Sequence, residues 1–181
     1  MANSRSVSST RTEMVQIMEP GDANFLGKVF GGRLLALIDL CAYTTASRFS
    51  GEVCVTASFD RVDFHHPIDV GDLVTTCGVV SYVGRTSVEV TIEVFAENIF
   101  TRERHHTNTA RVTMVAVRDG RPVPVPRLVC ETREDKVGFL QGRLRRDLRL
   151  EYREAREKRF EEIAQLSEED LEAMMAQNQA K

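Results

Sequence analysis

One carboxylate in an otherwise apolar segment is the residue of this sequence best suited to chemistry. Asp39 is the single charged residue between Leu34 and Ala46. The apolar residues around it recur at intervals of three and four, which predicts a buried helix. A carboxylate held in a dry cleft can act as a general base or as a nucleophile, because desolvation raises its basicity. The alternative is that Asp39 only borders the fold and meets water or an arginine.

The segment before this helix supplies further polar groups. Gly27, Gly31 and Gly32 let the backbone turn tightly and approach a ligand closely. Backbone N–H groups at the helix start, near Gly32 and Arg33, can donate to a developing oxyanion, aided by the helix dipole. Asn24 offers an amide that can hold a water or a carbonyl. A carboxylate, an amide and a helix N-terminus are together the parts needed to hydrolyse an acyl bond.

The order of the elements indicates how these groups are positioned. Residues 14–18 predict a short strand, residues 20–24 a loop, and the run that begins at Gly31 the helix. Four further segments are rich in Val, Thr, Ile and Phe and predict strands: 53–64, 73–83, 87–99 and 107–117. This order is not a βαβ repeat. It predicts an α+β fold in which an antiparallel sheet wraps around one long central helix.

Composition excludes several classes of protein. The 181 residues carry 24 Lys and Arg against 27 Asp and Glu, a net charge of -3, without the basic surplus of a nucleic-acid binder. No apolar run approaches the roughly 20 residues needed to cross a bilayer, so we expect no membrane insertion. The four cysteines form no CxxC pair, which favours reduced thiols in a cytoplasmic protein.

The chain divides into three parts by composition. Residues 1–12 are Ser-rich and predict a disordered start rather than a transit peptide. Residues 13–130 have the composition of a folded domain, and residues 131–181 predict a charged helical extension that breaks and restarts at Ser167. A narrow apolar stripe marks this extension: Leu140, Leu144, Leu148 and Tyr152. We expect the stripe to pack against another subunit or a neighbouring helix, the alternative being a fully solvated helix.

Two other groups of residues do not predict a site. His65 and His66, like His105 and His106, are adjacent residues whose side chains point to opposite faces of an extended chain, so no metal site is expected. Cys41 lies mid-helix among apolar residues without a basic partner, which predicts an inert core cysteine.

Five short motifs carry a resemblance to a known family. They are Asp22-Ala23-Asn24, Gly27-Lys28-Val29-Phe30-Gly31-Gly32, Leu37-Ile38-Asp39, Val70-Gly71-Asp72 and Val83-Gly84-Arg85-Thr86-Ser87. In these motifs the region from Glu13 to Leu128 resembles the hotdog-fold acyl-CoA thioesterases of the brain-type acyl-CoA hydrolase group. The resemblance implies a hotdog fold, a homodimer as the minimal active unit, and a higher homo-oligomer such as a hexamer.

The resemblance also implies an activity and roles for single residues. The chain would hydrolyse acyl-CoA to a free carboxylic acid and coenzyme A, without a further cofactor. Asn24 and Asp39 match two catalytic positions that different subunits supply to one site, and the Gly32 N–H would stabilise the oxyanion. Six positions would contact coenzyme A: Gly84, Arg85, Thr86, Ser87, Ala57 and Ser58. Whether Asp39 acts as base or as nucleophile stays open at this point.

Two alternative functions belong to other classes. A non-catalytic acyl-CoA-sensing module would share the fold, although the presence of both Asn24 and Asp39 argues against it. A hotdog dehydratase would want a catalytic histidine, and none of the four histidines is near the predicted helix in the sequence.

Overall fold

The computed structural model describes residues 4–60, 62–64 and 66–179 of the chain. Helices and strands follow one another in this order: β1 (Ser4–Ser6), η1 (Ser8–Thr10), β2 (Thr12–Ile17), η2 (Pro20–Asp22), α1 (Gly31–Ser50), β3 (Val53–Phe59), β4 (Leu73–Val83), β5 (Ser87–Glu97), β6 (Arg104–Arg118), β7 (Arg121–Pro122), β8 (Arg127–Val129), α2 (Arg133–Ala164) and α3 (Glu168–Gln179). None of the described helices is long and apolar enough to cross a bilayer.

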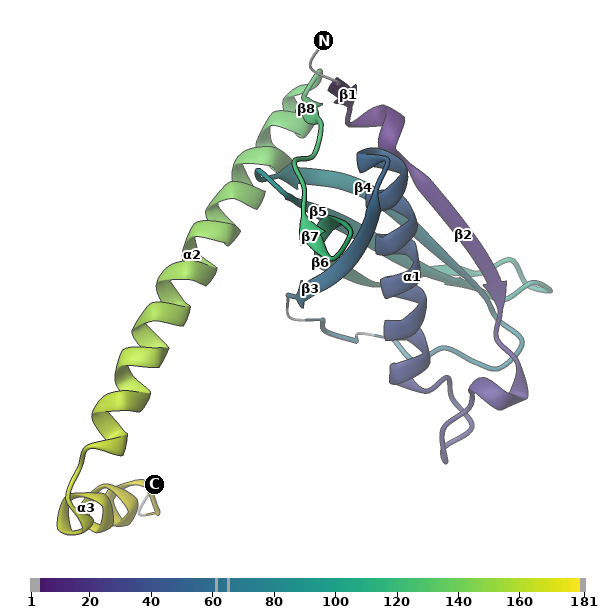
Figure 1. Cartoon of the computed structure of the whole chain (residues 1–181). Coiled ribbons are helices and arrows are strands. Elements are labelled where there is room, and N and C mark those ends of the chain that lie inside the picture. The colour runs from purple at the N-terminus through teal and green to yellow at the C-terminus, as the bar shows by residue number, and fades with distance from the viewer. Residues whose placement is uncertain (1–3, 61, 65, 180–181) are drawn as a thin grey trace. The chain divides into compact units, whose positions relative to one another are not determined.

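A curved sheet lies against helix α1 (Figure 1). Its strands run in the order β2-β4-β5-β6-β3, with β7 paired to β6, and every neighbouring pair is antiparallel. The predicted α+β architecture, with an antiparallel sheet around one central helix, is confirmed. Strand β3 ends at Phe59 rather than at residue 64, and β6 is longer than predicted.

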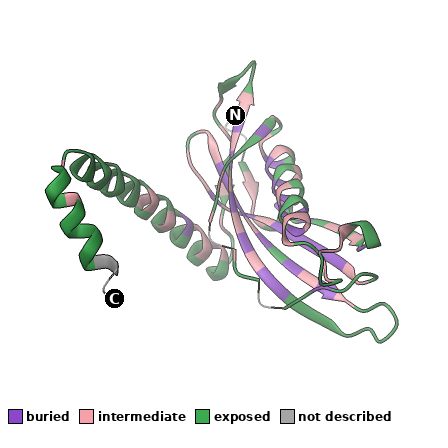
Figure 2. Cartoon of the chain, turned by 90° about the horizontal axis from the view of Figure 1, so that it is seen from below, coloured by how far each residue is buried: buried purple, intermediate pink, exposed green. Residues whose placement is uncertain are grey.

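The core lies between α1 and the concave face of this sheet. Buried and less buried residues alternate along the long strands, as the purple and pink segments of Figure 2 show. Cys41 is completely buried and its thiol donates to the Thr76 carbonyl at 3.9 Å. Burial raises the pKa of the Cys41 thiol, which fits an unreactive core cysteine. A Cβ atom at Gly78 would lie 3.0 Å from Cys41 Sγ and 2.5 Å from Thr45 Oγ1, so helix and sheet meet closely here.

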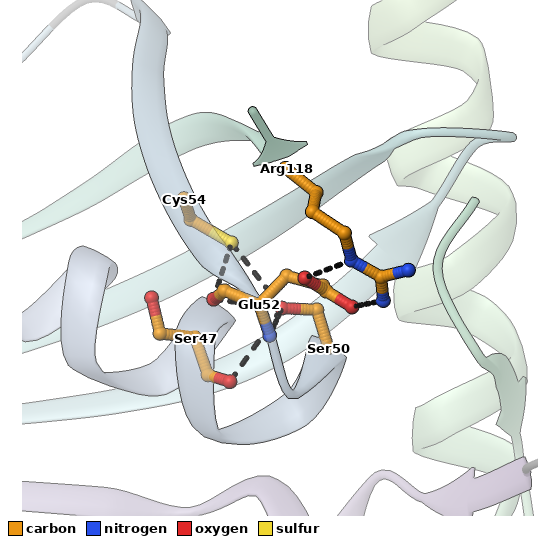
Figure 3. A network of polar contacts seen from close by, with 5 residues as sticks. All are labelled: Ser47, Ser50, Glu52, Cys54 and Arg118. Atoms are coloured by element: carbon orange, nitrogen blue, oxygen red, sulfur yellow. Dashed lines mark hydrogen bonds and ion pairs between the residues drawn. The ribbon is translucent and has the colours of Figure 1, made fainter. Parts of the chain in front are cut away.

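Helix α1 ends in a left-handed glycine followed by an ion pair. Gly51 has φ = 76° and donates its N–H to the Ser47 carbonyl at 2.8 Å. The next residue, Glu52, pairs with the guanidinium of Arg118 at the end of β6 (Figure 3). The hydrogen bond from Arg118 lowers the pKa of the Glu52 carboxyl group. The ion pair itself ties the end of α1 to the end of β6.

The prediction of a disordered start is wrong for residues 4–12. Strand β1 pairs in parallel with β8, which lies more than a hundred residues later in the chain. Thr10 is buried and its Oγ1 accepts a hydrogen bond from the Val80 N–H at 3.0 Å. A Ser-rich composition does not reveal such a distant partner, and residues 1–3 lie outside the described part of the chain.

The chain divides into two compact units, Met1–Gly142 and Arg143–Lys181. The first unit extends beyond residue 130 because the start of α2 packs on the sheet. The Phe139 and Tyr82 rings lie 5.0 Å apart between centroids, and Gly142 is buried. In the second unit, Ser167 Oγ accepts the Asp170 N–H at 3.2 Å, which confirms the predicted helix restart.

Candidate active site

Asn24 is locked by its own loop. Its Oδ1 accepts the N–H groups of Leu26 at 2.9 Å and Lys28 at 3.2 Å. Its backbone N–H donates to the Lys28 carbonyl at 2.7 Å, and the turn closes through Gly27 at φ = 74°. The Nδ2 group of Asn24 donates to no other described residue. The loop therefore fixes this side chain with its donor end available for a ligand.

Two ion pairs hold this loop against the rest of the fold. The Lys28 ammonium lies 2.5 Å from an Asp69 carboxylate oxygen, which anchors the loop to the segment before β4. Asp22 Oδ1 lies 2.7 Å from Arg33 Nε, which anchors the start of the loop to the first turn of α1. The position of Asn24 relative to the helix start is therefore fixed from both sides.

The first turn of α1 leaves two N–H groups available. Those of Gly31 and Gly32 have no acceptor among the described residues, whereas the Arg33 N–H donates to the Phe30 carbonyl at 2.9 Å. Of the two predicted oxyanion donors, the Gly32 N–H is thus available and the Arg33 N–H is not. A Cβ atom at Gly32 would lie 2.8 Å from Cζ of the exposed Phe30 ring, so a side chain here would displace that ring.

Asp39 meets a hydroxyl group at the edge of the sheet. It is half-buried on α1, and its Oδ1 accepts a hydrogen bond from Thr56 Oγ1 at 2.6 Å. The side-chain partner described for Asp39 is this hydroxyl and not an arginine. Thr56 lies on β3 and was not singled out from the sequence, because a threonine in a Val- and Thr-rich run reads as an ordinary strand residue.

The pocket that Asn24 lines does not reach Asp39. Asn24, Gly31, Phe64 and His66 are among the residues around a pocket of about 360 Å³ at the start of α1. Asp39 is not among them. The pocket beside Asn24 thus lacks the second expected catalytic side chain.

Four of the residues expected to contact coenzyme A, Gly84 to Ser87, make up the turn between β4 and β5 and the first residue of β5. The Gly84 N–H donates to the Ser87 carbonyl at 2.9 Å, and the Arg85 carbonyl accepts the Val125 N–H at 3.1 Å. Arg85 is exposed at the tip of this turn. The turn is therefore held in one conformation while its arginine stays accessible.

Strand register places this turn near Asp39. Val115 of β6 pairs with Ser87 on one side and with Val55 on the other. Val55 directly precedes Thr56, so the turn lies two strand spacings, or roughly 10 Å, from the Asp39 contact. Ala57 is the bulge residue of β3, and Ser58 follows it in register with Thr113.

Strand β3 is an edge strand that exposes apolar side chains. Its outer edge pairs with no described strand, and Val53, Val55 and Phe59 are 57%, 48% and 38% exposed. Native proteins usually cover or blunt such an edge. The Asp39–Thr56 contact therefore lies beside a surface suited to pairing with another chain.

The histidines form no metal site in the described part of the chain. His66 and His105 face each other with ring centroids 6.3 Å apart, and His106 Nε2 lies 3.0 Å from Thr109 Oγ1. Among described residues, no group of three or more His, Cys, Asp or Glu side chains is placed to hold a metal ion. His65 lies outside the described residues.

Comparisons with known proteins identify similar sequences and structures. Residues 26–99 match the family model described as the thioesterase superfamily. The chain is 43% identical over 117 residues to an uncharacterised acyl-CoA thioester hydrolase, YkhA, of Bacillus subtilis, covering 64% of this chain and 68% of that protein. A hexameric acyl-CoA thioesterase in its apo form has a similar structure, with a TM-score of 0.79, 39% identity, and coverage of 83% of this chain and 97% of the other.

An acyl-CoA hydrolase from Staphylococcus aureus is similar as well. Its complex with butyryl coenzyme A and coenzyme A gives a TM-score of 0.78 at 32% identity, covering 90% of this chain and 99% of the other. Structures of that enzyme also exist with a single aspartate, asparagine or threonine replaced by alanine. These are the three residue types found here at positions 39, 24 and 56.

Proposed function

The chain belongs to the hotdog-fold acyl-CoA thioesterases, which hydrolyse acyl-CoA to a free carboxylic acid and coenzyme A, and from this premise we propose that Asp39, Thr56 and Asn24 form its active site. The observation that carries the proposal is the 2.6 Å hydrogen bond from Thr56 Oγ1 to Asp39 Oδ1. It holds a carboxylate of the core helix in place beside the open edge of the sheet. One carboxylate oxygen is thereby fixed, and the other is left for the reaction.

A homodimer is the proposed minimal active unit. Asp39 does not line the pocket beside Asn24, and the edge of β3 beside Asp39 pairs with no described strand. A second copy that covers this edge would bring its own Asn24 loop to the Asp39 of the first. Further assembly of such dimers, into a hexamer like that of the similar thioesterase, is part of the same proposal.

The reaction can follow two routes from this arrangement. In the first, Asp39 Oδ2 takes a proton from water, and the water oxygen attacks the thioester carbonyl carbon. In the second, Asp39 itself attacks and forms a mixed anhydride, which water then hydrolyses. Both routes pass through a tetrahedral oxyanion that the Gly32 N–H and the Asn24 Nδ2 group would stabilise. In the first route this oxyanion collapses to the carboxylic acid as the C–S bond breaks and coenzyme A leaves as the thiolate, which then takes up a proton. In the second route the C–S bond breaks and the thiolate leaves when the mixed anhydride forms, and hydrolysis of the anhydride then releases the carboxylic acid and restores the Asp39 carboxylate.

The coenzyme A moiety would lie across β3 and the β4–β5 turn. Arg85 is exposed and can pair with a phosphate, and the backbone N–H groups and hydroxyls of Thr86 and Ser87 can add hydrogen bonds. Gly84 keeps the turn narrow, because a Cβ atom there would lie 2.6 Å from Ser87 Oγ. Ala57 and Ser58 would contact the moiety on its way to Asp39. Coenzyme A is here part of the substrate, and no other cofactor is proposed.

The cytoplasm is the proposed compartment of the enzyme. All four cysteines are free thiols, which is the usual state in a reducing compartment.

Mixing two inactive variants tests the shared active site. Asp39→Asn keeps the shape of the side chain but removes the proton acceptor. Asn24→Asp keeps an acceptor for the loop N–H groups but removes the Nδ2 donor. A mixed dimer then contains one site with both native residues and one site with neither, so random mixing should recover roughly a quarter of wild-type turnover.

Release of free thiol from acyl-CoA measures the recovery, and mass spectrometry confirms that mixed dimers form. Mixed dimers without activity would contradict the split site. A module that only binds acyl-CoA would release no thiol even as the wild type, so the same assay separates the enzyme from the sensing alternative.

A further inference from the structure

The pocket beside Asn24 combines hydrogen-bond donors with an apolar lining. Its donors are the Asn24 Nδ2 group and the Gly31 N–H, neither of which has an acceptor among the described residues. Six side chains form its apolar lining: Leu26, Val29, Leu34, Phe64, Pro67 and Ile68. None of the described residues around it is an aspartate or a glutamate. A thioester matches both features, because its carbonyl oxygen accepts hydrogen bonds and its acyl chain is a hydrocarbon.

The walls of this pocket differ in how firmly the fold holds them. Leu34 and Ile68 are 3% and 4% exposed and belong to the core between α1 and the sheet. Phe64 is 50% exposed and lies in the segment between β3 and β4. Its ring covers the start of α1, because a Cβ atom at Gly31 would lie 3.8 Å from Phe64 Cζ. Phe64 therefore bounds the pocket from outside the core, where a change of its size leaves core packing intact.

We propose that this pocket receives the acyl chain of the substrate and that Phe64 sets the chain length it accepts. The inference rests on the proposed function and places the acyl group within that reaction. The thioester carbonyl lies at Asn24 and the free N–H groups of the first turn of α1. The Asp39 that completes the site belongs to the second copy, so the substrate spans the dimer. The acyl group lies on the chain that supplies Asn24, and coenzyme A on the chain that supplies Asp39.

Two basic side chains also line the pocket, and both have partners outside it. The Lys28 ammonium is neutralised by the Asp69 carboxylate at 2.5 Å. The His66 ring faces that of His105, with 6.3 Å between ring centroids. Neither Asp69 nor His105 is among the residues around the pocket. This arrangement favours an uncharged hydrocarbon chain over an acyl group that carries a second carboxylate.

The volume of the pocket favours short and medium acyl chains. About 360 Å³ is near the lower end of the range of roughly 300–1,000 Å³ found for small-molecule sites. Each methylene that enters an apolar pocket strengthens binding about fourfold, and methylenes beyond its limit add little. Affinity should therefore rise with chain length and then level off, and Phe64 determines the length at which it does so.

Binding of S-alkyl coenzyme A thioethers tests the proposal without relying on catalysis. These analogues carry the hydrocarbon chain but have no thioester to hydrolyse. Calorimetry on the full chain gives Kd for alkyl groups of about four to sixteen carbons. We expect Kd of the wild type to fall about fourfold per methylene up to a limiting length and to change little beyond it.

Variants at Phe64 should move this limiting length in opposite directions. Phe64→Ala enlarges the pocket and should shift the limit to chains longer by about two carbons or more, whereas Phe64→Trp should shift it to shorter chains. Phe100→Ala is the matched control, because Phe100 is 89% exposed and does not line the pocket. Its series should match that of the wild type.

The outcomes separate this inference from the proposed function. A limiting length that neither Phe64 variant moves would overturn the role of Phe64, and a Kd that does not depend on chain length would overturn the acyl pocket itself. Thiol release from acyl-CoA, measured on the same proteins, tests hydrolysis independently. A wild type that shows the expected Kd series but releases no thiol would support the pocket and contradict the proposed reaction.

Discussion

Helices α1 and α2 differ in where their charged side chains lie. Between Leu34 and Ala46, α1 carries one charge, Asp39, and that carboxylate has a specific partner on the sheet. Helix α2 is charged along most of its length, and of its residues, all of which the structure describes, only Gly142 is buried. A single charged side chain on a buried helix points to a functional role, because burying a charge without a partner costs free energy.

On the solvated helix the informative residue is one without a side chain. A Cβ atom at Gly142 would lie 2.9 Å from Glu89 Oε1 and 3.2 Å from Tyr82 Cγ. Glu89 is only 2% exposed and accepts a hydrogen bond from Ser81 Oγ at 2.9 Å. Gly142 therefore lets α2 approach a buried carboxylate on the outer face of the sheet. Charge density along α2 says nothing about this contact.

The largest expected effect is at the single charge of α1. Asp39→Asn removes the proton acceptor and should lower kcat by about 10²-fold or more in a thiol-release assay. Asp147→Asn removes a carboxylate from α2 and should leave kcat unchanged, so the pair of variants tests whether the two helices differ as described. Wild-type turnover in a folded Asp39→Asn protein would contradict the assignment.

A smaller effect is expected at the partner of Asp39. Thr56→Val keeps the shape of the side chain but removes the hydroxyl that holds the carboxylate, and should lower kcat about tenfold with KM little changed. Thr56→Ser keeps the hydroxyl and should restore most of the rate. If the serine and valine variants are equally impaired, the hydroxyl is not what positions Asp39.

On α2 we expect an effect on stability rather than on turnover. Gly142→Ala should lower the free energy of unfolding by about 1–3 kcal/mol, because the added methyl group displaces Tyr82 or Glu89. Gly138→Ala is the matched control. A Cβ atom there meets nothing within 4 Å, so the change should stabilise α2 by up to about 1 kcal/mol. Thermal unfolding measures both, and equal Tm values for the two variants would argue against docking at Gly142.

The smallest effect is expected at the exposed ion pair that follows α1. The Arg118 hydrogen bond lowers the pKa of Glu52 from its usual 4.5. The contribution of this pair to stability is therefore present above pH 4.5 and is lost as the pH falls through the lowered pKa. Glu52→Gln should be slightly less stable than wild type at pH 7, and the difference should vanish in acid. A difference in Tm that does not change with pH would indicate an effect other than ionisation.

Local sequence is enough to single out those residues of the proposed site that stand out within their own segment. Asp39 and Asn24 were identifiable because each stands out against its own segment, one as a charge in a helix and one in a glycine-rich loop. Gly32 followed from the helix start. The Arg33 N–H was wrongly included, since the first turn of α1 tightens so that this group bonds to the Phe30 carbonyl.

Contacts between distant segments could not be predicted in this way. Thr56 meets Asp39 only because β3 takes the edge position of the sheet. Residues 4–6 are ordered as a strand because they pair with β8. The first unit extends into α2 because Gly142 is buried, in a segment whose sequence otherwise predicts a solvated helix. In each case one of the two contacting segments has a local sequence that does not indicate the contact.

The close approach of helix and sheet at Gly78 has a consequence for the substrate. Cys41, Ala42 and Ala46 are fully buried between α1 and the strands, and Gly78 leaves no room beside them. At this point a hydrocarbon tail therefore finds no volume between helix and sheet. We expect discrimination between short and long acyl groups to depend instead on residues where two copies meet. Selectivity would thus be a property of the assembly, and altering how the subunits pair would alter which acyl groups are accepted.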